Sequence, residues 1–392
     1  MPRPRERSPA RRPASRPPLY LAQCARGLEE VVAGELLGLG ARHVEAVAGG
    51  ARFAASPDAA RRALLWLRSA VRLLEPVVSG AAATPDQLYE LAAGVRWEEL
   101  VGTRHTFAVK ASVSERGFGD ARFAALRVKD AIADRIRSRR GRRPDVDRRD
   151  PDVPVRVIVR RGEAHLFRDL AGGSLHRRGY RPIQVRSPLP EATAAGLLLL
   201  TGWDGASPLL DPMCGSGTFV LEAALLALER APGLERGFAA ERFPDADPKL
   251  WGRLRQEARD RQRRRLPAPI VGSDRHEGAL GIARESARRA GLEGQVELRL
   301  ADAATLVPDP APGVVVANPP WGERLGEGRE LAESWRALGG LLRRCPGARA
   351  YVLSGAPGLT RHLGLKASRR WPLRVGPQDV RWLRYEILPR RG

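Results

Sequence analysis

The strongest constraint on the fold of this chain is the alternation of apolar strands with amphipathic helices between residues 207 and 355. Helices that cross over between parallel strands cover both faces of a sheet, so this alternation predicts an α/β domain with a mixed, mostly parallel sheet. We place that domain at residues 187–392, with a charged insertion at 232–269 that is helical in its later part. The pattern predicts strands at 207–211, 270–274, 296–302, 314–318 and 350–355, and helices at 217–230 and 277–290.

Residues 19–170 lack this alternation and predict two smaller α+β units, at 19–75 and 76–170. The first contains a strand at 19–23, an amphipathic helix, a strand pair at 42–55 and a helix at 58–68. The second contains a helix at 86–100, a strand at 106–112, a long helix from about residue 122 and a hairpin that turns at Gly162. Residues 171–186 form a polar connector. Residues 1–18 are rich in arginine and proline and are predicted to be a disordered basic tail.

The formal net charge of +22 favours a polyanionic partner, and nucleic acid is the first candidate. Nearly all the basic residues are arginines, a composition that a GC-rich genome also produces. A run of arginines follows the long helix, where positive charge complements the negative end of the helix dipole and also suits phosphates. The predicted connector at 171–186 contains further arginines. The predicted RNA contacts are Arg139, Arg140, Arg142, Arg143, Arg177 and Arg178.

The three cysteines, Cys24, Cys214 and Cys345, are far apart and belong to no Cys/His cluster, so the sequence predicts reduced thiols and no metal. The chain has no apolar run long enough to span a bilayer, and its first residues lack the apolar stretch of a secretory signal. These features predict a cytoplasmic protein without a membrane partner.

The segment DPMCGSGTF, residues 211–219, lies where a predicted strand meets a helix. Gly215 and Gly217 permit a tight turn and the close approach of a ligand to backbone N–H groups. The segment has neither the third glycine of a dinucleotide site nor the lysine of a P-loop. An acid directly before the glycines suits a cationic ligand better than a pyrophosphate, which favours S-adenosylmethionine.

Two further strands end in acids, Asp274 and Asp302. A carboxylate at the second strand end typically accepts hydrogen bonds from ribose hydroxyls, and Asp302 suits an adenine amine. Each aspartate alone could instead cap a helix or form a turn. Taken together with the glycines, they predict one adenosine-bearing ligand across the carboxyl edge of the sheet. The predicted cofactor residues are Asp211, Cys214, Gly215, Ser216, Gly217, Thr218, Asp274 and Asp302.

The segment VVVANPPWG, residues 314–322, ends another strand at the same edge. Pro319 and Pro320 fix the backbone and remove two donors, so only acceptors are presented there. An exocyclic amine of a nucleobase could donate to the Asn318 side-chain oxygen and the Pro319 carbonyl. Both bonds would strengthen as the nitrogen becomes more positive in the transition state. Trp321 would stack on the extruded base. The alternative is a plain turn with a core aromatic. We predict Asn318, Pro319, Pro320 and Trp321 as the catalytic residues.

The segments DPMCGSGTFVLEAALLA, APGLERGFAAERFP and VVVANPPWGERLG, in that order, resemble the catalytic domain of the THUMP-domain class I RNA methyltransferases. Within that family the similarity is to the bacterial large-subunit ribosomal RNA guanine-N2 methyltransferases. RVKDAIADRIRSRRGRRPDVD and LAGGSLHRRGYR resemble the THUMP module and its exit. The resemblance implies a ferredoxin-like unit and a THUMP domain for RNA capture, followed by a Rossmann-like methyltransferase domain that binds S-adenosylmethionine.

The resemblance therefore implies methyl transfer from S-adenosylmethionine to the exocyclic N2 of a guanosine, with 23S ribosomal RNA as the first candidate substrate; we expect no obligate protein partner. Transfer RNA guanosine-N2 and adenine N6 in DNA are the alternative substrates, because the NPPW motif is shared with adenine methyltransferases. A non-catalytic RNA-binding assembly factor is the alternative from another class. The sequence specifies neither the modified nucleotide nor the oligomeric state.

Overall fold

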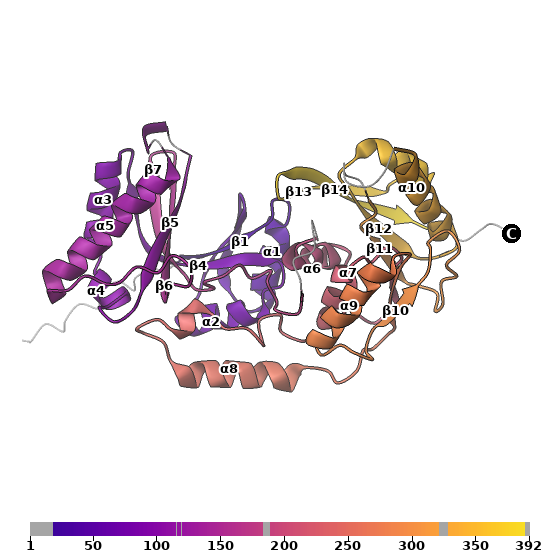
Figure 1. Ribbon diagram of the computed structural model, residues 1–392, viewed down its shortest axis with the longest axis horizontal. Coiled ribbons are helices and arrows are strands. Elements are labelled where there is room, and N and C mark those ends of the chain that lie inside the picture. The colour runs from indigo at the N-terminus through magenta and orange to yellow at the C-terminus, as the bar shows by residue number, and fades with distance from the viewer. Residues whose placement is uncertain (1–18, 115, 119, 183–188, 321–327, 389–392) are drawn as a thin grey trace, which may run out of the picture.

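The computed structural model describes residues 19–114, 116–118, 120–182, 189–320 and 328–388. The predicted tail at 1–18 and the predicted catalytic residue Trp321 lie outside the described residues. Two bodies stand side by side in Figure 1, an N-terminal body in indigo and magenta and a catalytic body in orange and yellow. Within the described part of the chain, no helix combines the length and apolarity needed to cross a membrane.

The N-terminal body is built on one seven-stranded sheet of order β2-β3-β1-β4-β7-β6-β5. Its long central strand β4 pairs with β1 on one side (Leu21 opposite Leu74) and with β7 on the other (Ser79 opposite His165). The two predicted α+β units therefore share a single sheet, and the predicted boundary at 75/76 falls inside β4. The strands are β1 (Leu19–Cys24), β2 (Arg42–Val47), β3 (Gly50–Ala54), β4 (Ala70–Ala81), β5 (Phe107–Val113), β6 (Val153–Arg160) and β7 (Glu163–Asp169).

Helices pack on one face of this sheet around a single apolar core. The longest, α5, begins at the Asp120 side chain, which accepts a hydrogen bond from the Phe123 N–H, and ends at Gly141 with a φ of 72°. Its residues Val128, Ile132 and Ile136 are fully buried. The helices are α1 (Glu29–Gly38), α2 (Pro57–Trp66), α3 (Pro85–Ala93), α4 (Trp97–Leu100) and α5 (Ala121–Arg140), with a 3₁₀ turn η1 (Arg116–Phe118).

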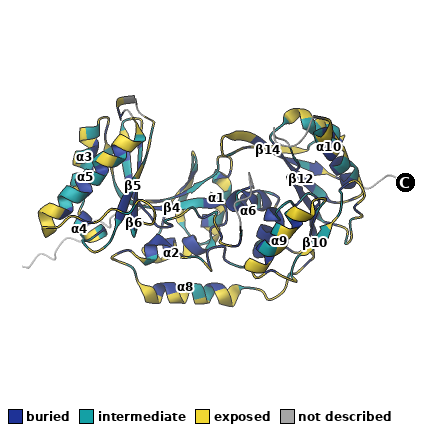
Figure 2. Cartoon of the chain, viewed as in Figure 1, coloured by how far each residue is buried: buried dark blue, intermediate teal, exposed yellow. Residues whose placement is uncertain are grey.

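The predicted insertion at 232–269 packs against the N-terminal body although it branches from the catalytic domain. It contains a 3₁₀ turn η2 (Ala239–Glu241) and the helix α8 (Pro248–Arg261), which runs beneath α2 in Figure 1. Phe238 and Trp251 join the N-terminal core and stack at a centroid distance of 5.5 Å. Figure 2 shows the matching pattern on α8, buried on one side and exposed on the other. The insertion therefore fastens the two bodies together.

The catalytic body is a second seven-stranded sheet of order β10-β9-β8-β11-β12-β14-β13. The first five strands are parallel, and β14 runs antiparallel to both of its neighbours, β12 and β13, which confirms the predicted mixed, mostly parallel α/β fold. One face of the sheet packs against α6, α7 and α9, and the other against α10. The strands are β8 (Leu209–Asp211), β9 (Ile270–Asp274), β10 (Glu297–Leu300), β11 (Val314–Ala317), β12 (Arg349–Ser354), β13 (Arg369–Val375) and β14 (Gln378–Glu386); the helices are α6 (Glu191–Leu200), α7 (Thr218–Ala227), α9 (Glu277–Arg289), α10 (Gly328–Arg343) and the 3₁₀ segment η3 (Pro357–Leu363).

Residues 171–182, the described part of the predicted connector, pack at the interface between the bodies. Arg178 is only 7% exposed and pairs with the fully buried Glu222 at 3.4 Å. Its guanidinium also donates to the carbonyls of Leu175 and Arg68, and Tyr180 donates to Glu222. The prediction that Arg178 contacts RNA is therefore wrong, because its charge is buried and satisfied within the protein.

Candidate active site

The loop between β8 and α7 forms the predicted glycine turn. Gly215 and Gly217 have φ values of +53° and +81°, a backbone conformation that residues other than glycine rarely adopt. The Gly215 N–H donates to the Asp274 carboxylate at 2.9 Å, which ties the loop to the end of β9. No heavy atom lies within 4 Å of the position that a Cβ at Gly215 would take, counting the described residues apart from its own chain neighbours. The backbone at Gly215 is therefore open to a ligand.

Asp211 ends β8 directly beneath this turn and is 1% exposed. Its carboxylate accepts a hydrogen bond from the Met213 N–H at 3.2 Å. Burial, followed by the nearby charge of Asp274, raises the pKa of Asp211 to about 8. Asp211 and Asp274 thus lie at the same edge of the sheet. No arginine is among the groups that shift the pKa of Asp211. This arrangement favours a cationic ligand.

Cys214 and Thr218 flank the two glycines. Burial and the charges of Asp211 and Asp274 raise the pKa of Cys214 well above its usual value, so its sulfur is a thiol rather than a thiolate nucleophile. The Thr218 hydroxyl begins α7 and accepts a hydrogen bond from Arg181 at 2.9 Å. Cys214 therefore contributes volume to the loop, and Thr218 links the loop to the segment before α6.

Asp302 lies at the same edge, beyond the end of β10. Leu300 is in register with Asp274, so Asp302 lies two residues further along the neighbouring strand. Its carboxylate accepts a hydrogen bond from the Ala304 N–H at 2.7 Å. Asp302 therefore also forms a turn, as in the alternative interpretation of this residue. The position suits the predicted adenine contact, and the turn holds it in place.

Glu191 is a polar residue that the sequence interpretation missed. It begins α6, is 3% exposed, and its Oε2 atom is buried with no hydrogen-bond partner in the described residues. Arg181 lies 3.6 Å from its other oxygen and also binds Thr218. Burial raises the pKa of Glu191. The signal was present in PEATAAGLLLL, where a single acid opens an otherwise apolar helix.

The Asn-Pro-Pro segment leaves the sheet beside the glycine turn. It follows β11, whose Val315 is in register with Leu210 on β8, so both segments leave the same carboxyl edge on adjacent strands. Pro319 is buried and Asn318 is half-buried. The indole N–H of Trp335, a fully buried residue of α10, donates to the Pro320 carbonyl at 2.8 Å. That bond fixes the position of the Pro320 carbonyl, next to Pro319 and Asn318 in the chain. Trp335 was not predicted from the sequence.

The remaining predicted RNA contacts are distributed over two surfaces. Arg139 and Arg140 are exposed at the end of α5 and form no ion pair with the described residues. Arg142 and Arg143 lie within 3.6 Å and 3.0 Å of Asp145 and Asp134, which partly neutralise them. Arg177 is exposed in the connector.

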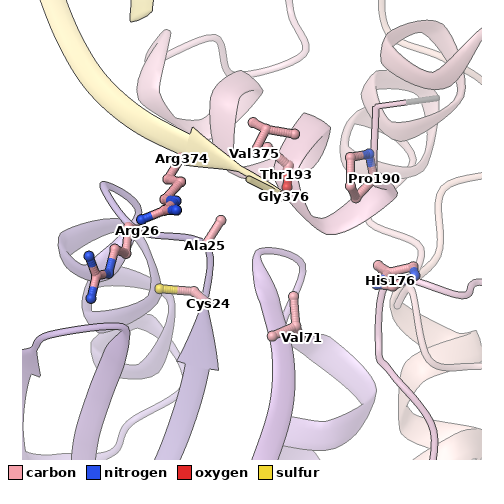
Figure 3. Close-up of a pocket in the computed structure, with 10 residues that line it drawn as sticks. All are labelled: Cys24, Ala25, Arg26, Val71, His176, Pro190, Thr193, Arg374, Val375 and Gly376. Atoms are coloured by element: carbon pink, nitrogen blue, oxygen red, sulfur yellow. The ribbon is translucent and has the colours of Figure 1, made fainter. Parts of the chain in front are cut away.

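A pocket of about 400 Å³ separates the two bodies next to α6. Figure 3 shows His176 on the opposite side of the pocket from Arg26 and Arg374. Burial and the surrounding arginines lower the pKa of His176 to about 4, so this histidine is neutral near pH 7. None of the predicted cofactor residues lines the pocket.

Comparisons with known proteins agree with this architecture. Residues 178–384 match the family "RMKL-like, methyltransferase domain", residues 82–169 the THUMP domain, and residues 20–74 the RlmL ferredoxin-like domain. The chain is 41% identical to the ribosomal RNA large subunit methyltransferase K/L of Syntrophotalea carbinolica, over 95% of this chain and 54% of that protein. It is 36% identical to a proposed RNA methyltransferase of Synechocystis sp., over 94% of this chain and 96% of that protein. The chain thus spans about half the length of the K/L relatives.

Solved structures with the same architecture include SMU.472, a proposed methyltransferase in complex with SAH, with a TM-score of 0.88 and 28% identity over 96% of this chain and 99% of that chain. A predicted N6-adenine-specific DNA methylase from Listeria monocytogenes has a TM-score of 0.86 and 32% identity, over 95% of this chain and 96% of that chain.

Proposed function

Because the chain belongs to the RMKL-like methyltransferase family, in its form with a ferredoxin-like domain and a THUMP domain, we propose that it methylates the exocyclic N2 of a guanosine in RNA. The first candidate substrate is 23S ribosomal RNA, in keeping with the names of the K/L relatives. The observation that carries the proposal is an Asn-Pro-Pro corner, whose two prolines lack backbone donors, on the strand next to a glycine turn edged with acids.

The residues at the edge of the sheet fit S-adenosylmethionine, the cofactor of this family. When bound, the cofactor supplies an electrophilic methyl group. Asp274 and Asp302, at the ends of adjacent strands, would hold the ribose and the adenine amine. The open backbone at Gly215 allows the ligand to approach closely. Asp211, whose pKa is raised to about 8, would ionise beneath the turn when the cationic cofactor binds.

Glu191 would accept a hydrogen bond from the ammonium group of the methionine moiety. Its buried Oε2 lacks a partner among the described residues, and Arg181 links it to Thr218 at the end of the glycine turn. Leaving a buried carboxylate oxygen unsatisfied costs free energy, which a cationic ligand would recover. Replacing Glu191 by Gln should weaken binding of S-adenosylhomocysteine about tenfold or more, since hydrogen bonds to charged groups contribute about 1.5–3 kcal/mol. Binding of 5′-methylthioadenosine, which lacks the ammonium group, should be unchanged in calorimetry. Equal losses for both ligands would refute the role of Glu191.

Asn318 and Pro319 would orient the target amine. Each amine hydrogen has its own acceptor, one side-chain oxygen and one carbonyl, which directs the nitrogen lone pair toward the methyl group. As positive charge develops on the nitrogen, both hydrogen bonds strengthen, so the corner stabilises the transition state more than the bound substrate. Trp335 holds the corner through the Pro320 carbonyl, so little reorganisation is needed.

The test is the Asn318→Ala variant. Methyl transfer to ribosomal RNA should fall by at least about 100-fold, the range seen when one preorganised transition-state hydrogen bond is removed. Affinity for S-adenosylmethionine, measured by calorimetry, should remain nearly unchanged because Asn318 does not contact the cofactor in this proposal. Unchanged methyl transfer would exclude the proposed mechanism.

Adenine N6 in DNA is the second candidate, favoured by the name of the Listeria monocytogenes structure and by the shared NPPW motif. It predicts tritium transfer to duplex DNA in the absence of RNA. A transfer RNA guanosine would be acted on by the same chemistry. Mass spectrometry of ribosomal and transfer RNA from a deletion strain separates these substrates, because only the true target loses its methyl group. A non-catalytic assembly factor would leave all of them methylated.

A further inference from the structure

The face of the N-terminal sheet opposite the helices carries a groove of about 970 Å³, which we call the open-face groove. Successive residues of a strand point to opposite faces. On β1, Tyr20 and Ala22 enter the core, whereas Leu19 and Leu21 line the groove. The groove spans several strands, and it lies in the part of the chain that matches the ferredoxin-like and THUMP families. It is lined by residues of the segments 19–23, 47–52, 76–79, 158–161 and 163–167, together with Ser112.

The floor of the groove is apolar and carries a pair of stacked rings. Leu19 on β1 is 48% exposed, and Ile158 on β6 is half-buried; both line the groove, with β4 and β7 between them. The rings of His165 and Phe167 stack with centroids 6.3 Å apart and planes 26° apart. Burial and the charge of Arg52 lower the pKa of His165, so this ring is neutral near pH 7. Phe167 is buried and supports the partly exposed His165 ring, so His165 is the ring of this pair that a flat ligand can reach.

Positive charge surrounds this floor. Arg52, Arg160 and Arg161 line the groove, and none of them forms an ion pair with any described residue. By contrast, the neighbouring Arg156 on the same strand is paired with Asp169 at 3.1 Å. The acid in the groove is Glu163, 3.7 Å from His165. The three arginines are therefore available to an anionic ligand.

We propose that the open-face groove binds unpaired nucleotides of the RNA substrate, with bases on the apolar floor and phosphates at the three arginines. This inference rests on the proposed function in taking RNA as the substrate. A duplex presents phosphates and sugars on its outside and cannot place base faces on Ile158 and the His165 ring, whereas unpaired bases can. A protein partner would match the apolar floor but leave the unpaired arginines without a specific role.

The test is binding of the full chain to a labelled twelve-nucleotide unstructured RNA and to an RNA duplex of the same length, by fluorescence anisotropy. The Arg52→Gln/Arg160→Gln variant should bind the unpaired RNA at least tenfold more weakly, and the salt slope should fall by about 0.7 for each phosphate that the variant no longer neutralises. His165→Ala should weaken binding by about fivefold or more because a base can no longer stack on the ring. The matched control is Arg264→Gln/Arg265→Gln, which changes two exposed arginines beyond α8 that form no ion pair with described residues. It should leave the affinity unchanged.

Equal losses for duplex and unpaired RNA in the groove variants would overturn the proposal in favour of nonspecific attraction. Unchanged binding of unpaired RNA, with thermal melting equal to wild type, would also overturn it. If these variants instead altered only sedimentation of the chain, the groove would be a protein interface. Methyl transfer by the wild-type chain is measured separately. Absence of methyl transfer would refute the proposed function without affecting the result for the groove. Failure of the proposed function and failure of the groove proposal are therefore distinguishable.

Discussion

Replacing Asp211 by Asn should make the protein more stable and less able to bind its cofactor. Burial and the nearby Asp274 raise the pKa of Asp211 from 3.8 to about 8. The folded protein therefore holds a proton on Asp211 over a pH range in which the unfolded chain has lost it. The stability from this residue is fully present below about pH 3.8 and is lost as the pH rises toward 8. Asn has nearly the same shape, keeps an oxygen for the Met213 N–H, and does not titrate.

The magnitude follows from the window between those pKa values. Within this window, each unit of rising pH lowers the unfolding free energy of the wild type by about 1.4 kcal/mol. The total loss at pH 7 is therefore at most about 4 kcal/mol. Between pH 5 and pH 7 the stability advantage of the Asp211→Asn variant should grow by about 3 kcal/mol. Other titrating groups are common to both proteins and cancel in this difference. Urea titrations at the two pH values measure it, and an advantage that does not change with pH would refute the assignment.

Cofactor binding gives the same residue a second signature. A cation next to Asp211 favours its ionised form, so binding of S-adenosylmethionine near pH 7 should release close to one proton. Calorimetry in two buffers with different ionisation heats measures this release. The Asp211→Asn variant should bind more weakly and release no proton from this site. Identical proton release in both proteins would place the cation elsewhere.

Three further substitutions test the supports of the site. Trp335→Phe removes the N–H that binds the Pro320 carbonyl and should lower kcat about tenfold at unchanged cofactor affinity, measured by steady-state methyl transfer. Arg178→Met leaves Glu222 buried without its counter-charge and should cost about 3–5 kcal/mol in urea titrations; the double variant with Glu222→Leu should recover most of that loss. An arginine that bound RNA would instead lose RNA affinity at constant stability. Gly27→Ala places a methyl group against the Pro372 carbonyl at a φ of +92° and should cost about 1–3 kcal/mol in thermal melting, with increased proteolysis of the β13–β14 hairpin.

The strands that end at the active edge could be predicted from the sequence because each is a short apolar run closed by a polar residue. Asp274 and Asn318 end such runs, and both are found at the predicted edge. The strand β4 escaped prediction for the opposite reason. Pro76 and Gly80 break its alternation, and the pairing with β7 shifts register between Pro76 and Val78, a bulge that accommodates the proline. Only tertiary pairing reveals that this segment joins two units into one sheet.

Residues whose role depends on a distant partner were also hidden. Arg178 lies in a basic segment and resembles a phosphate-binding residue until its buried partner Glu222, 44 residues away, is known. Trp335 could not be connected with Pro320 from spacing. Its helix α10 packs on one face of the sheet, and only that packing brings the indole N–H to the Pro320 carbonyl. Burial and partnership are properties of the folded chain, and composition does not encode them.

The distribution of buried acids also points to the cofactor edge. Elsewhere in the structure buried acids are satisfied, as with Asp169, which is bound by Arg72 at 2.6 Å and by Arg156 at 3.1 Å. Arginine is abundant in a chain of net charge +22, so a shortage of basic residues does not explain why a buried acid lacks a partner. Yet Asp211 accepts only one hydrogen bond from the described residues, and one oxygen of Glu191 accepts none from them. Burial raises the pKa of both carboxyl groups and so favours their neutral forms. A cation bound at this edge would favour their ionised forms, and a sulfonium donor with a free ammonium group carries that charge.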